Sequence, residues 1–165
     1  MTTSTLTAAS TAPEMIFTMG LPAAGKSTVV EARYAATHTV IDPDAVKEGH
    51  KDYDPKNPAA LHQWSTEITE SQFAGALAAA SGRWVVDGTG TNAEKMVRKM
   101  NAARCAGFTI RLVYVTCTIQ TSIARNAART RVVPAYVIIE KARDIATSFE
   151  LIAPHADSVE IVKND

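Results

Sequence analysis

The stretch Gly20-Leu21-Pro22-Ala23-Ala24-Gly25-Lys26-Ser27-Thr28 decides the fold that we expect for this chain. Two glycines with four residues between them, followed directly by lysine and serine, are typical of a phosphate-binding loop. The preceding residues, Met15-Ile16-Phe17-Thr18-Met19, predict a short buried strand, and residues 27–36 predict a helix. A strand, a glycine-containing turn and a helix in this order form the context that the motif requires.

The residue types in this loop suit the phosphates of a nucleotide. Glycines let backbone N–H groups approach phosphate oxygens, and the N-terminus of the following helix is positively polarised. Lys26 can reach the outer phosphates, and the Ser27 hydroxyl can ligate Mg²⁺. We therefore expect a nucleoside triphosphate, ATP or GTP, with Mg²⁺, held by these residues: Gly20, Ala23, Ala24, Gly25, Lys26, Ser27 and Thr28.

Length and composition favour one globular domain. The chain has 165 residues, which is enough for one substantial core. Residues 1–13 are mostly Thr, Ser and Ala and predict a disordered tail, which leaves residues 14–165 as the domain. There is no long apolar run, and Cys105 and Cys117 predict reduced packing residues, so we expect a cytoplasmic protein without a membrane span.

Strands and helices alternate along the rest of the chain. Strands are expected at residues 38–41, 83–87, 108–115 and 159–162, and helices at residues 45–48, 58–80, 92–106, 119–128 and 134–151. This alternation favours an α/β fold with a mostly parallel sheet and helices on both faces. Ligands bind beyond the carboxyl ends of the strands in such sheets, so polar residues that follow strands are candidates for chemistry.

Three acids follow predicted strands at that edge. Asp42 and Asp44 follow the second strand, and either could accept the proton of an attacking hydroxyl; the alternative role for Asp42 is a turn or helix cap. Asp87 closes the third strand and could hold Mg²⁺ together with Ser27 or bind the acceptor, or else cap the next loop. Tyr53, in a polar loop, is a further candidate for the acceptor pocket.

An arginine-rich segment at residues 125–134 predicts a lid. Arg125, Arg129 and Arg131 carry planar, permanently charged groups that suit phosphate. A segment that closes over the nucleotide would stabilise charge during transfer and exclude water. The alternative is a solvated charged face. Residues 83–143 carry eleven Lys and Arg but three acids, which suggests a face that meets anions.

Taken together, several motifs resemble the zeta-toxin-like P-loop kinases. They are the phosphate-binding loop, Val40-Ile41-Asp42-Pro43-Asp44-Ala45-Val46-Lys47, Val85-Val86-Asp87-Gly88-Thr89-Gly90 and Ala106-Gly107-Phe108. Arg129-x-Arg131-x-Val133-Pro134 is similar to the lid of the wider group that includes bacteriophage polynucleotide kinases. The match extends over nearly the whole chain after residue 14. It implies a small kinase-type P-loop NTPase fold, a three-layer α/β sandwich with a five-stranded parallel sheet and an Arg-rich lid.

The resemblance also implies roles for single residues. Asp44 rather than Asp42 would be the base, and Lys47, three residues further on, would lie near the acceptor. The implied catalytic residues are Lys26, Asp44, Arg125, Arg129 and Arg131. The implied acceptor-binding residues are Asp42, Lys47, Tyr53, Asp87, Thr89 and Asn92, with Ser27 and Asp87 as metal ligands.

The implied activity is that of a kinase that uses ATP and Mg²⁺ to phosphorylate a hydroxyl group. Zeta toxins usually have Glu at the position of Asp87 and a basic residue where this chain has Thr91-Asn92. These departures and the basic segment favour a nucleic-acid acceptor, DNA or RNA, at a 5′-end or a hydroxymethylated base, or another nucleotide-type acceptor. The alternatives are a nucleotide-sugar kinase, with an antitoxin-like protein partner, and a regulatory NTPase that uses water.

Overall fold

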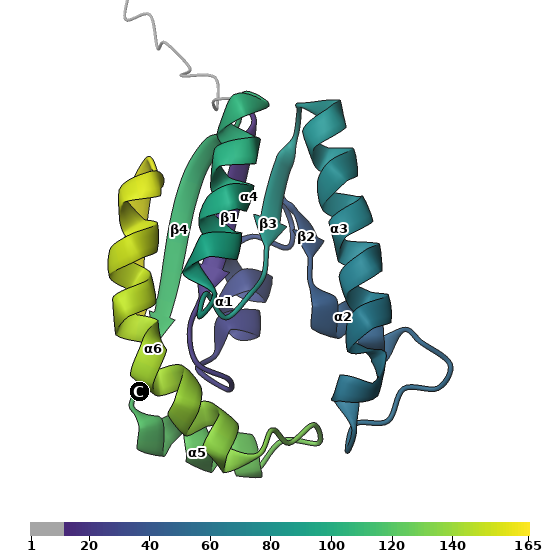
Figure 1. Ribbon diagram of the computed structural model, residues 1–165, viewed down its shortest axis with the longest axis vertical. Coiled ribbons are helices and arrows are strands. Elements are labelled where there is room, and N and C mark those ends of the chain that lie inside the picture. Colours follow the sequence, from purple (N-terminus) through teal and green to yellow (C-terminus); the bar gives the residue numbers. More distant parts are fainter. Residues whose placement is uncertain (1–11) are drawn as a thin grey trace, which may run out of the picture.

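Five parallel strands form the centre of the protein, in the order β2-β3-β1-β4-β5 (Figure 1). The computed structural model describes residues 12–165, so the tail expected at residues 1–13 lies outside this range except for its last two residues. The strands are β1 (Glu14–Met19), β2 (Thr39–Ile41), β3 (Arg83–Val86), β4 (Thr109–Thr116) and β5 (Ser158–Lys163). The prediction of a five-stranded parallel sheet is confirmed.

Helices cover both faces of the sheet. They are α1 (Lys26–Arg33), α2 (Pro43–Glu48), α3 (His62–Ala79), α4 (Ala93–Cys105), α5 (Ile119–Ala127) and α6 (Ala135–Ile152). The chain crosses the sheet in one direction from β1 to β2 and in the opposite direction from β2 onward to β5. Because such crossovers are right-handed, α1 lies on one face and α3, α4 and α6 lie on the other, as Figure 1 shows.

The central strand β1 is the most deeply buried element of the sheet. Met15, Ile16, Phe17, Thr18 and Met19 are all fully buried, without the alternation of a strand that has one wet face. Continuous burial of this kind is typical of a strand that is covered by helices on both faces of the sheet. The burial fixes the end of β1, and therefore the start of the phosphate-binding loop, against the rest of the sheet.

Two predicted helices differ by three or more residues at one end, and the helix expected at residues 45–48 begins two residues earlier, at Pro43. The helix after the phosphate-binding loop ends at Arg33 rather than near Ala36, because buried Tyr34 leaves the helical conformation and its carbonyl accepts bonds from the next turn. The helix expected from residue 58 begins at His62, after a 3-10 turn at Pro58–Leu61. No helix within residues 12–165 combines the length and apolar character needed to cross a bilayer.

Candidate active site

The phosphate-binding loop joins β1 to α1 at the carboxyl edge of the sheet. Gly25 precedes α1 in a left-handed conformation (φ 98°), and a Cβ atom there would lie 2.1 Å from Nδ2 of Asn164. Both the backbone angle and the space therefore require glycine. The N–H of Gly20 donates to the carbonyl of Thr89 over 2.9 Å, which ties the loop to the segment after β3.

The next loop supports the phosphate-binding loop because of a second glycine. Gly90 has φ 79°, and a Cβ atom on it would lie 2.4 Å from Cβ of Met19. The Gly-Thr-Gly segment after Asp87 therefore packs closely against the end of β1. Packing against β1 is therefore a structural reason for the Gly-Thr-Gly pattern, which the sequence alone connected with acceptor binding.

Lys26 bends back over the loop that precedes it. Its Nζ donates to the carbonyl of Gly20 over 2.9 Å and to that of Leu21 over 2.8 Å. Ser27 and Thr28 follow on the exposed first turn of α1. Lysine, serine and the helix N-terminus therefore all lie at one end of the loop, as an anion site requires.

Charges of both signs surround Lys26. Burial lowers the pKa of Lys26; Asp87 and Asp44 oppose this, whereas the positive charges of Arg129 and Lys141 lower the pKa further. Within residues 12–165, no ion pair joins Arg129 or Lys141 to an acid. A polyphosphate placed here would relieve the repulsion among these cations.

Asp42 and Asp44 have different surroundings. Asp42 is the N-cap of α2, where its Oδ1 accepts a bond from the N–H of Asp44 over 2.8 Å. Burial, followed by repulsion from Asp87, raises the pKa of Asp42 to about 6. The structure therefore gives Asp42 the helix-cap role that the sequence had left as its alternative.

Asp44 faces the lid. Its Oδ1 lies 2.5 Å from Nη1 of Arg131, and 43% of the Asp44 side chain is exposed. Burial by itself would raise the pKa of Asp44, but the hydrogen bond and charge of Arg131, together with Lys47 and Lys26, outweigh it and lower that pKa. Asp44 is therefore an ionised and accessible carboxylate at the carboxyl edge of the sheet.

Asp87 is anchored by β1. It accepts a short hydrogen bond from the hydroxyl of Thr18, and that hydroxyl accepts a bond from the N–H of Gly88 over 3.2 Å. Burial raises the pKa of Asp87, although Thr18 and the charge of Lys26 partly offset this effect. The Asp87 carboxylate is thus held in a fixed orientation near Lys26.

The donor set fits Mg²⁺ only in combination with a nucleotide. Within residues 12–165, no group of three or more His, Cys, Asp and Glu side chains could hold a metal ion. Mg²⁺ usually takes one or two protein ligands and completes its shell with water and phosphate oxygens. Ser27 and Asp87 are oxygen donors of the kind it prefers, so these two residues fit the ion.

The segment predicted as a lid begins on α5, and an asparagine holds its turn together. The side chain of Asn126, which is 3% exposed, donates to the carbonyl of Val133 over 2.6 Å and accepts from its N–H over 2.9 Å. These paired bonds close the turn between α5 and α6. Residues 128–134 therefore have a defined shape that presents Arg131 to Asp44.

Arg125 differs from the other two lid arginines. Its Nη1 donates to the carbonyl of Asn164 over 2.6 Å and reaches that of Ala24 at 3.5 Å. Nδ2 of Asn164 donates to the same Ala24 carbonyl over 2.8 Å. Arg125 thus links α5 to the phosphate-binding loop and to the segment after β5, whereas Arg129 and Arg131 lie toward Lys26 and Asp44.

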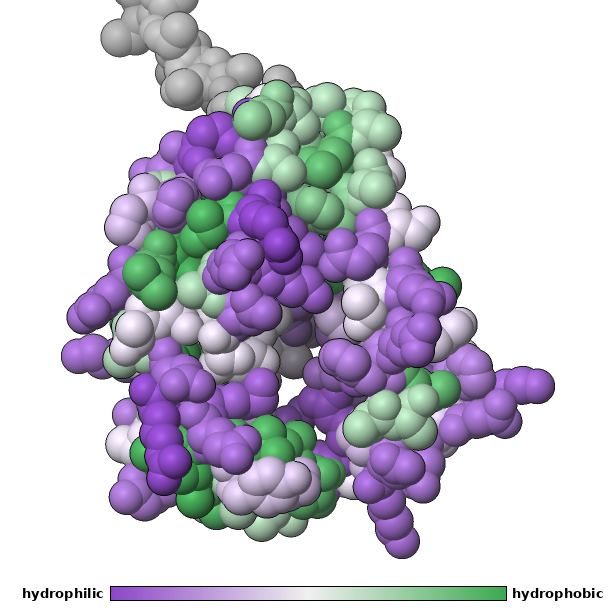
Figure 2. Space-filling model, viewed as in Figure 1, coloured by the Kyte–Doolittle hydropathy of each residue, from purple (hydrophilic) through white to green (hydrophobic). Residues whose placement is uncertain are grey.

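The remaining acceptor candidates lie around the same edge. Lys47 is buried in α2 and its charge acts on Asp44, and Tyr53 lies close enough to act electrostatically on Arg131. Asn92 caps α4 by accepting from the N–H of Lys95 over 3.0 Å. In Figure 2 the surface is hollowed between the lid at the bottom and the segment leading into α3 on the right.

Sequence reasoning missed four residues that shape this site. They are Thr18, Asn126, Lys141 and Asn164. Thr18 carried a signal, because it is the one hydroxyl in an otherwise apolar five-residue strand. Lys141 read as part of a solvated helix face, and its position near Lys26 depends on the docking of α6, which no local pattern reveals.

A central strand that leads through this loop into a helix, within a parallel sheet of this order, defines a P-loop nucleotide-binding protein. The chain belongs to a family of P-loop proteins described as AAA domain, which matches residues 15–152. The predicted resemblance to the zeta-toxin-like P-loop kinases is confirmed at the level of the fold by solved structures. No curated protein sequence matches the chain.

Three solved structures are similar to the protein in fold. A chain of the PezAT toxin–antitoxin system of Streptococcus pneumoniae has a TM-score of 0.71 at 16% identity, over 96% of this chain and 70% of that one. A chain of the AvrRxo1-ORF1:AvrRxo1-ORF2 complex has a TM-score of 0.69 at 16% identity, over 87% and 50%. A proposed kinase from Chloroflexus aurantiacus has a TM-score of 0.62 at 18% identity, over 94% and 87%.

Proposed function

We propose that this protein is a kinase that uses ATP and Mg²⁺ to phosphorylate a hydroxyl group of a nucleic acid or another nucleotide-type acceptor. The observation that carries the proposal is the position of Asp44. Its ionised carboxylate lies at the edge where the phosphate-binding loop ends, within electrostatic reach of Lys26 and in contact with the lid arginine Arg131. A base, a lysine that binds phosphate and an arginine beside the base are parts that phosphoryl transfer uses.

Each of these residues has a defined task in the proposed reaction. The loop amides and Lys26 orient the outer phosphates. Ser27 and Asp87 would hold Mg²⁺, which would supply positive charge to neutralise the phosphate oxygens. Asp44 orients the acceptor hydroxyl and takes its proton as the hydroxyl oxygen attacks the γ-phosphorus. The bond from the γ-phosphorus to the bridging oxygen breaks, and ADP leaves. Arg131 and Arg129 stabilise the negative charge on the transferred group.

The distribution of basic residues bears on the choice of acceptor. Arg83 and Arg111 each pair with Glu14 at 3.6 Å, at the edge of the sheet opposite the site. The basic residues of positions 83–143 therefore do not form one face that could meet a polyanion. Lys47 and Arg131 remain beside Asp44, and two cations next to the base favour an acceptor that carries phosphate.

Two other functions stay open. The PezAT structure is that of a toxin–antitoxin system, which favours a toxin-like kinase with an inhibitor protein as partner. The AvrRxo1-ORF1:-ORF2 complex has also been solved with ATP, which supports ATP as the nucleotide. A regulatory NTPase would use the same loop with water as the acceptor. The carboxylate of Asp44 next to Lys47 favours a bound hydroxyl over water.

A transfer assay with γ-labelled ATP tests the proposal. The acceptors are oligonucleotides with ordinary and hydroxymethylated bases, free nucleosides and nucleotide sugars. We expect label on an oligonucleotide or nucleoside, and we expect Lys26→Ala to weaken both nucleotide binding and transfer. Label that appears only as free phosphate would contradict the kinase proposal, and label only on a nucleotide sugar would replace the acceptor proposed here.

A further inference from the structure

A groove separates α3 from α4 on the face of the sheet opposite α1. Its volume is about 330 Å³. Its lining residues come from both helices: Thr66, Glu70, Phe73, Lys95, Arg98, Lys99 and Ala102. The two helices do not pack mainly on each other, because α3 packs on α2 and α4 packs on α6. The groove therefore results from the arrangement of the two helices and is not a void left by one poorly packed side chain.

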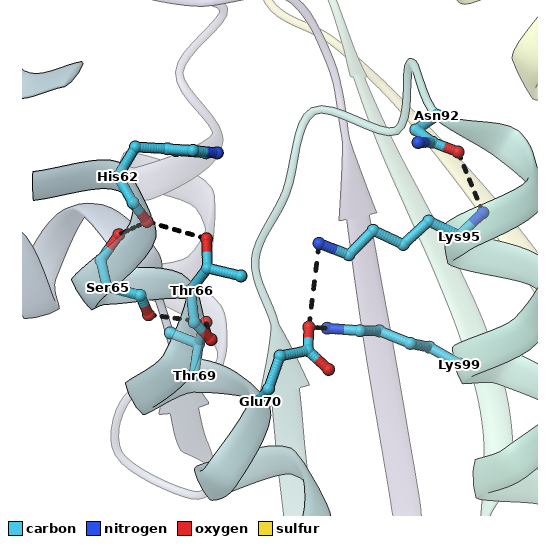
Figure 3. A network of polar contacts seen from close by, with 8 residues as sticks. All are labelled: His62, Ser65, Thr66, Thr69, Glu70, Asn92, Lys95 and Lys99. Carbon is cyan, nitrogen blue, oxygen red and sulfur yellow. Dashed lines mark hydrogen bonds and ion pairs between the residues drawn. The ribbon is translucent and has the colours of Figure 1, made fainter.

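Lysines from α4 reach across the groove to one acid of α3. Nζ of Lys99 lies 2.6 Å and Nζ of Lys95 lies 3.8 Å from Oε1 of Glu70, as Figure 3 shows. Lys99 also lies over the ring of Phe73, with Nζ 5.0 Å from the ring centre. One carboxylate cannot neutralise two ammonium groups, so the groove keeps an excess of positive charge.

Arg98 adds a third cation on the same helix. Its only ion pair among the described residues is with Glu94 of the preceding turn at 3.6 Å, and both side chains are more than two-thirds exposed. Such a pair contributes little and exchanges readily with another anion. In Figure 2 hydrophilic residues gather over α4, above the hollow of the site.

We propose that this groove binds the sugar–phosphate backbone of a single-stranded nucleic acid whose hydroxyl is phosphorylated at Asp44. The inference rests on the proposed function and names the part of the acceptor that lies outside the reaction centre. Both α3 and α4 begin at the carboxyl edge of the sheet, so the groove runs away from the site. Lys95 and Lys99 lie one helical turn apart, about 6 Å along the axis, and can contact successive phosphates.

In this arrangement the Glu70 carboxylate pairs with Lys95 and Lys99 until a phosphate displaces it. If the groove binds nucleic acid, substitutions of the lysines and of Glu70 should change its affinity in opposite directions. Loss of the lysines weakens binding of the polyanion, and loss of the Glu70 charge strengthens it. A groove that merely joins α3 to α4 would respond differently, because breaking the ion pair from either side would cost stability and leave binding unchanged.

The test measures binding of a fluorescently labelled, single-stranded 5′-hydroxyl oligonucleotide of about 12 nucleotides, without ATP, over a series of salt concentrations. The variants are Lys95→Gln/Lys99→Gln and Glu70→Gln. The matched controls are Arg33→Gln and Glu160→Gln, which break an ion pair between α1 and β5, away from the groove. Circular dichroism and melting temperature check that each variant is folded.

We expect the double lysine variant to bind more weakly and to lose about 1.4 from the slope of log K against log salt, because about 0.7 is lost for each phosphate contact. Glu70→Gln should bind several-fold more tightly. Both controls should bind like the original protein. Equal binding by the double lysine variant and Arg33→Gln, or weaker binding by Glu70→Gln, would overturn the proposal.

Two further outcomes separate this proposal from the kinase proposal. If a mononucleotide binds as tightly as the oligonucleotide and shows the same dependence on Lys95 and Lys99, the groove is a site for a small anion and the proposal is wrong. If no oligonucleotide binds, the proposal is wrong as well. In either case transfer of label to a small hydroxyl acceptor would leave the kinase proposal standing.

Discussion

The guanidinium of Arg131 and the carboxylate of Asp44 contact each other across the mouth of the site, with Nη1 and Oδ1 2.5 Å apart. Nε of Arg131 is buried and has no hydrogen-bond partner among the described residues. The lid arginine and the proposed base are therefore partners in this structure. During transfer Arg131 would exchange part of this contact for phosphate oxygens, which would free Asp44 to accept a proton.

This contact predicts a pH effect of Arg131→Ala. The arginine lowers the pKa of Asp44 against an opposing effect of burial, so its loss should raise that pKa. The acid limb of the pH–rate profile should move to higher pH, and kcat at high pH should fall by about 100-fold or more. Initial rates between about pH 5 and pH 8 measure both effects.

Arg33→Ala is the control for Arg131→Ala, because it removes an exposed arginine and its ion pair at the last turn of α1, where it contacts β5 and not Asp44. Its profile should match that of the original protein. If Arg131→Ala has unchanged kinetics, Arg131 belongs to a solvated charged surface and has no role in transfer.

Asp44→Asn should separate binding from transfer. The amide keeps the size of the side chain but cannot accept the proton, so kcat should fall by about 10²–10⁴-fold while ATP affinity stays close to normal. Nucleotide binding by calorimetry and single-turnover transfer give the two quantities. Asp42→Asn is the matched control, since asparagine preserves the helix cap, and it should retain most of the activity. Normal turnover by Asp44→Asn would disprove its role.

Asp42 should affect stability through its pKa. A carboxyl whose pKa rises from its ordinary value to about 6 on folding destabilises the folded state when it is ionised. The stability contribution of Asp42 is therefore present below about pH 4 and lost as the pH rises through about 6. Asp42→Asn should raise the unfolding free energy at neutral pH by roughly 1–2 kcal/mol, after allowance for solvent screening. Urea unfolding at several pH values would show it, and identical pH dependence in both proteins would contradict it.

Thr18 should act through Asp87. Its hydroxyl donates to the Asp87 carboxylate and accepts from Gly88, so Thr18→Val would leave two partly buried polar groups without that partner. We expect a loss of about 1–3 kcal/mol in unfolding free energy and a higher Mg²⁺ requirement for ATP binding. Thr18→Ser should restore both quantities, because it keeps the hydroxyl. If Thr18→Val loses stability while its Mg²⁺ requirement is unchanged, Thr18 supports the fold but does not position Asp87 for the ion.

Local pattern was enough for the sheet and for the residues that end its strands. The strand–loop–helix that begins with β1 and ends with α1, and the acids after β2 and β3, follow from short-range rules of spacing and polarity. What the sequence could not provide is the set of contacts made at long range. Asn164 reaches the phosphate-binding loop from beyond β5, and Thr18 meets Asp87 across the pairing of β1 with β3. Such contacts depend on strand order, which the alternation of elements leaves open.

The choice between Asp42 and Asp44 shows the same limit. Both follow β2, and either could have been the base on the sequence alone. Only the conformation of α2 turns one carboxylate onto its own helix and the other toward the lid. For a similar reason the basic residues of positions 83–143 do not form the one face that the sequence suggests, because Arg83 and Arg111 pair with Glu14, far away in the sequence.

The shape of the lid depends on Asn126, which gives the last prediction. Asn126→Ala would remove both bonds that close the turn to Val133, and the freed backbone groups would take up water as the turn loosens. Arg131 would then be presented to Asp44 less often, so kcat should fall while nucleotide binding at the loop changes little. Hydrogen exchange at the Val133 amide should speed up. Asn101→Ala, at an exposed asparagine of α4, is the control and should change neither quantity. Fast exchange at Val133 with unchanged kcat would mean that a closed lid turn is not required for transfer.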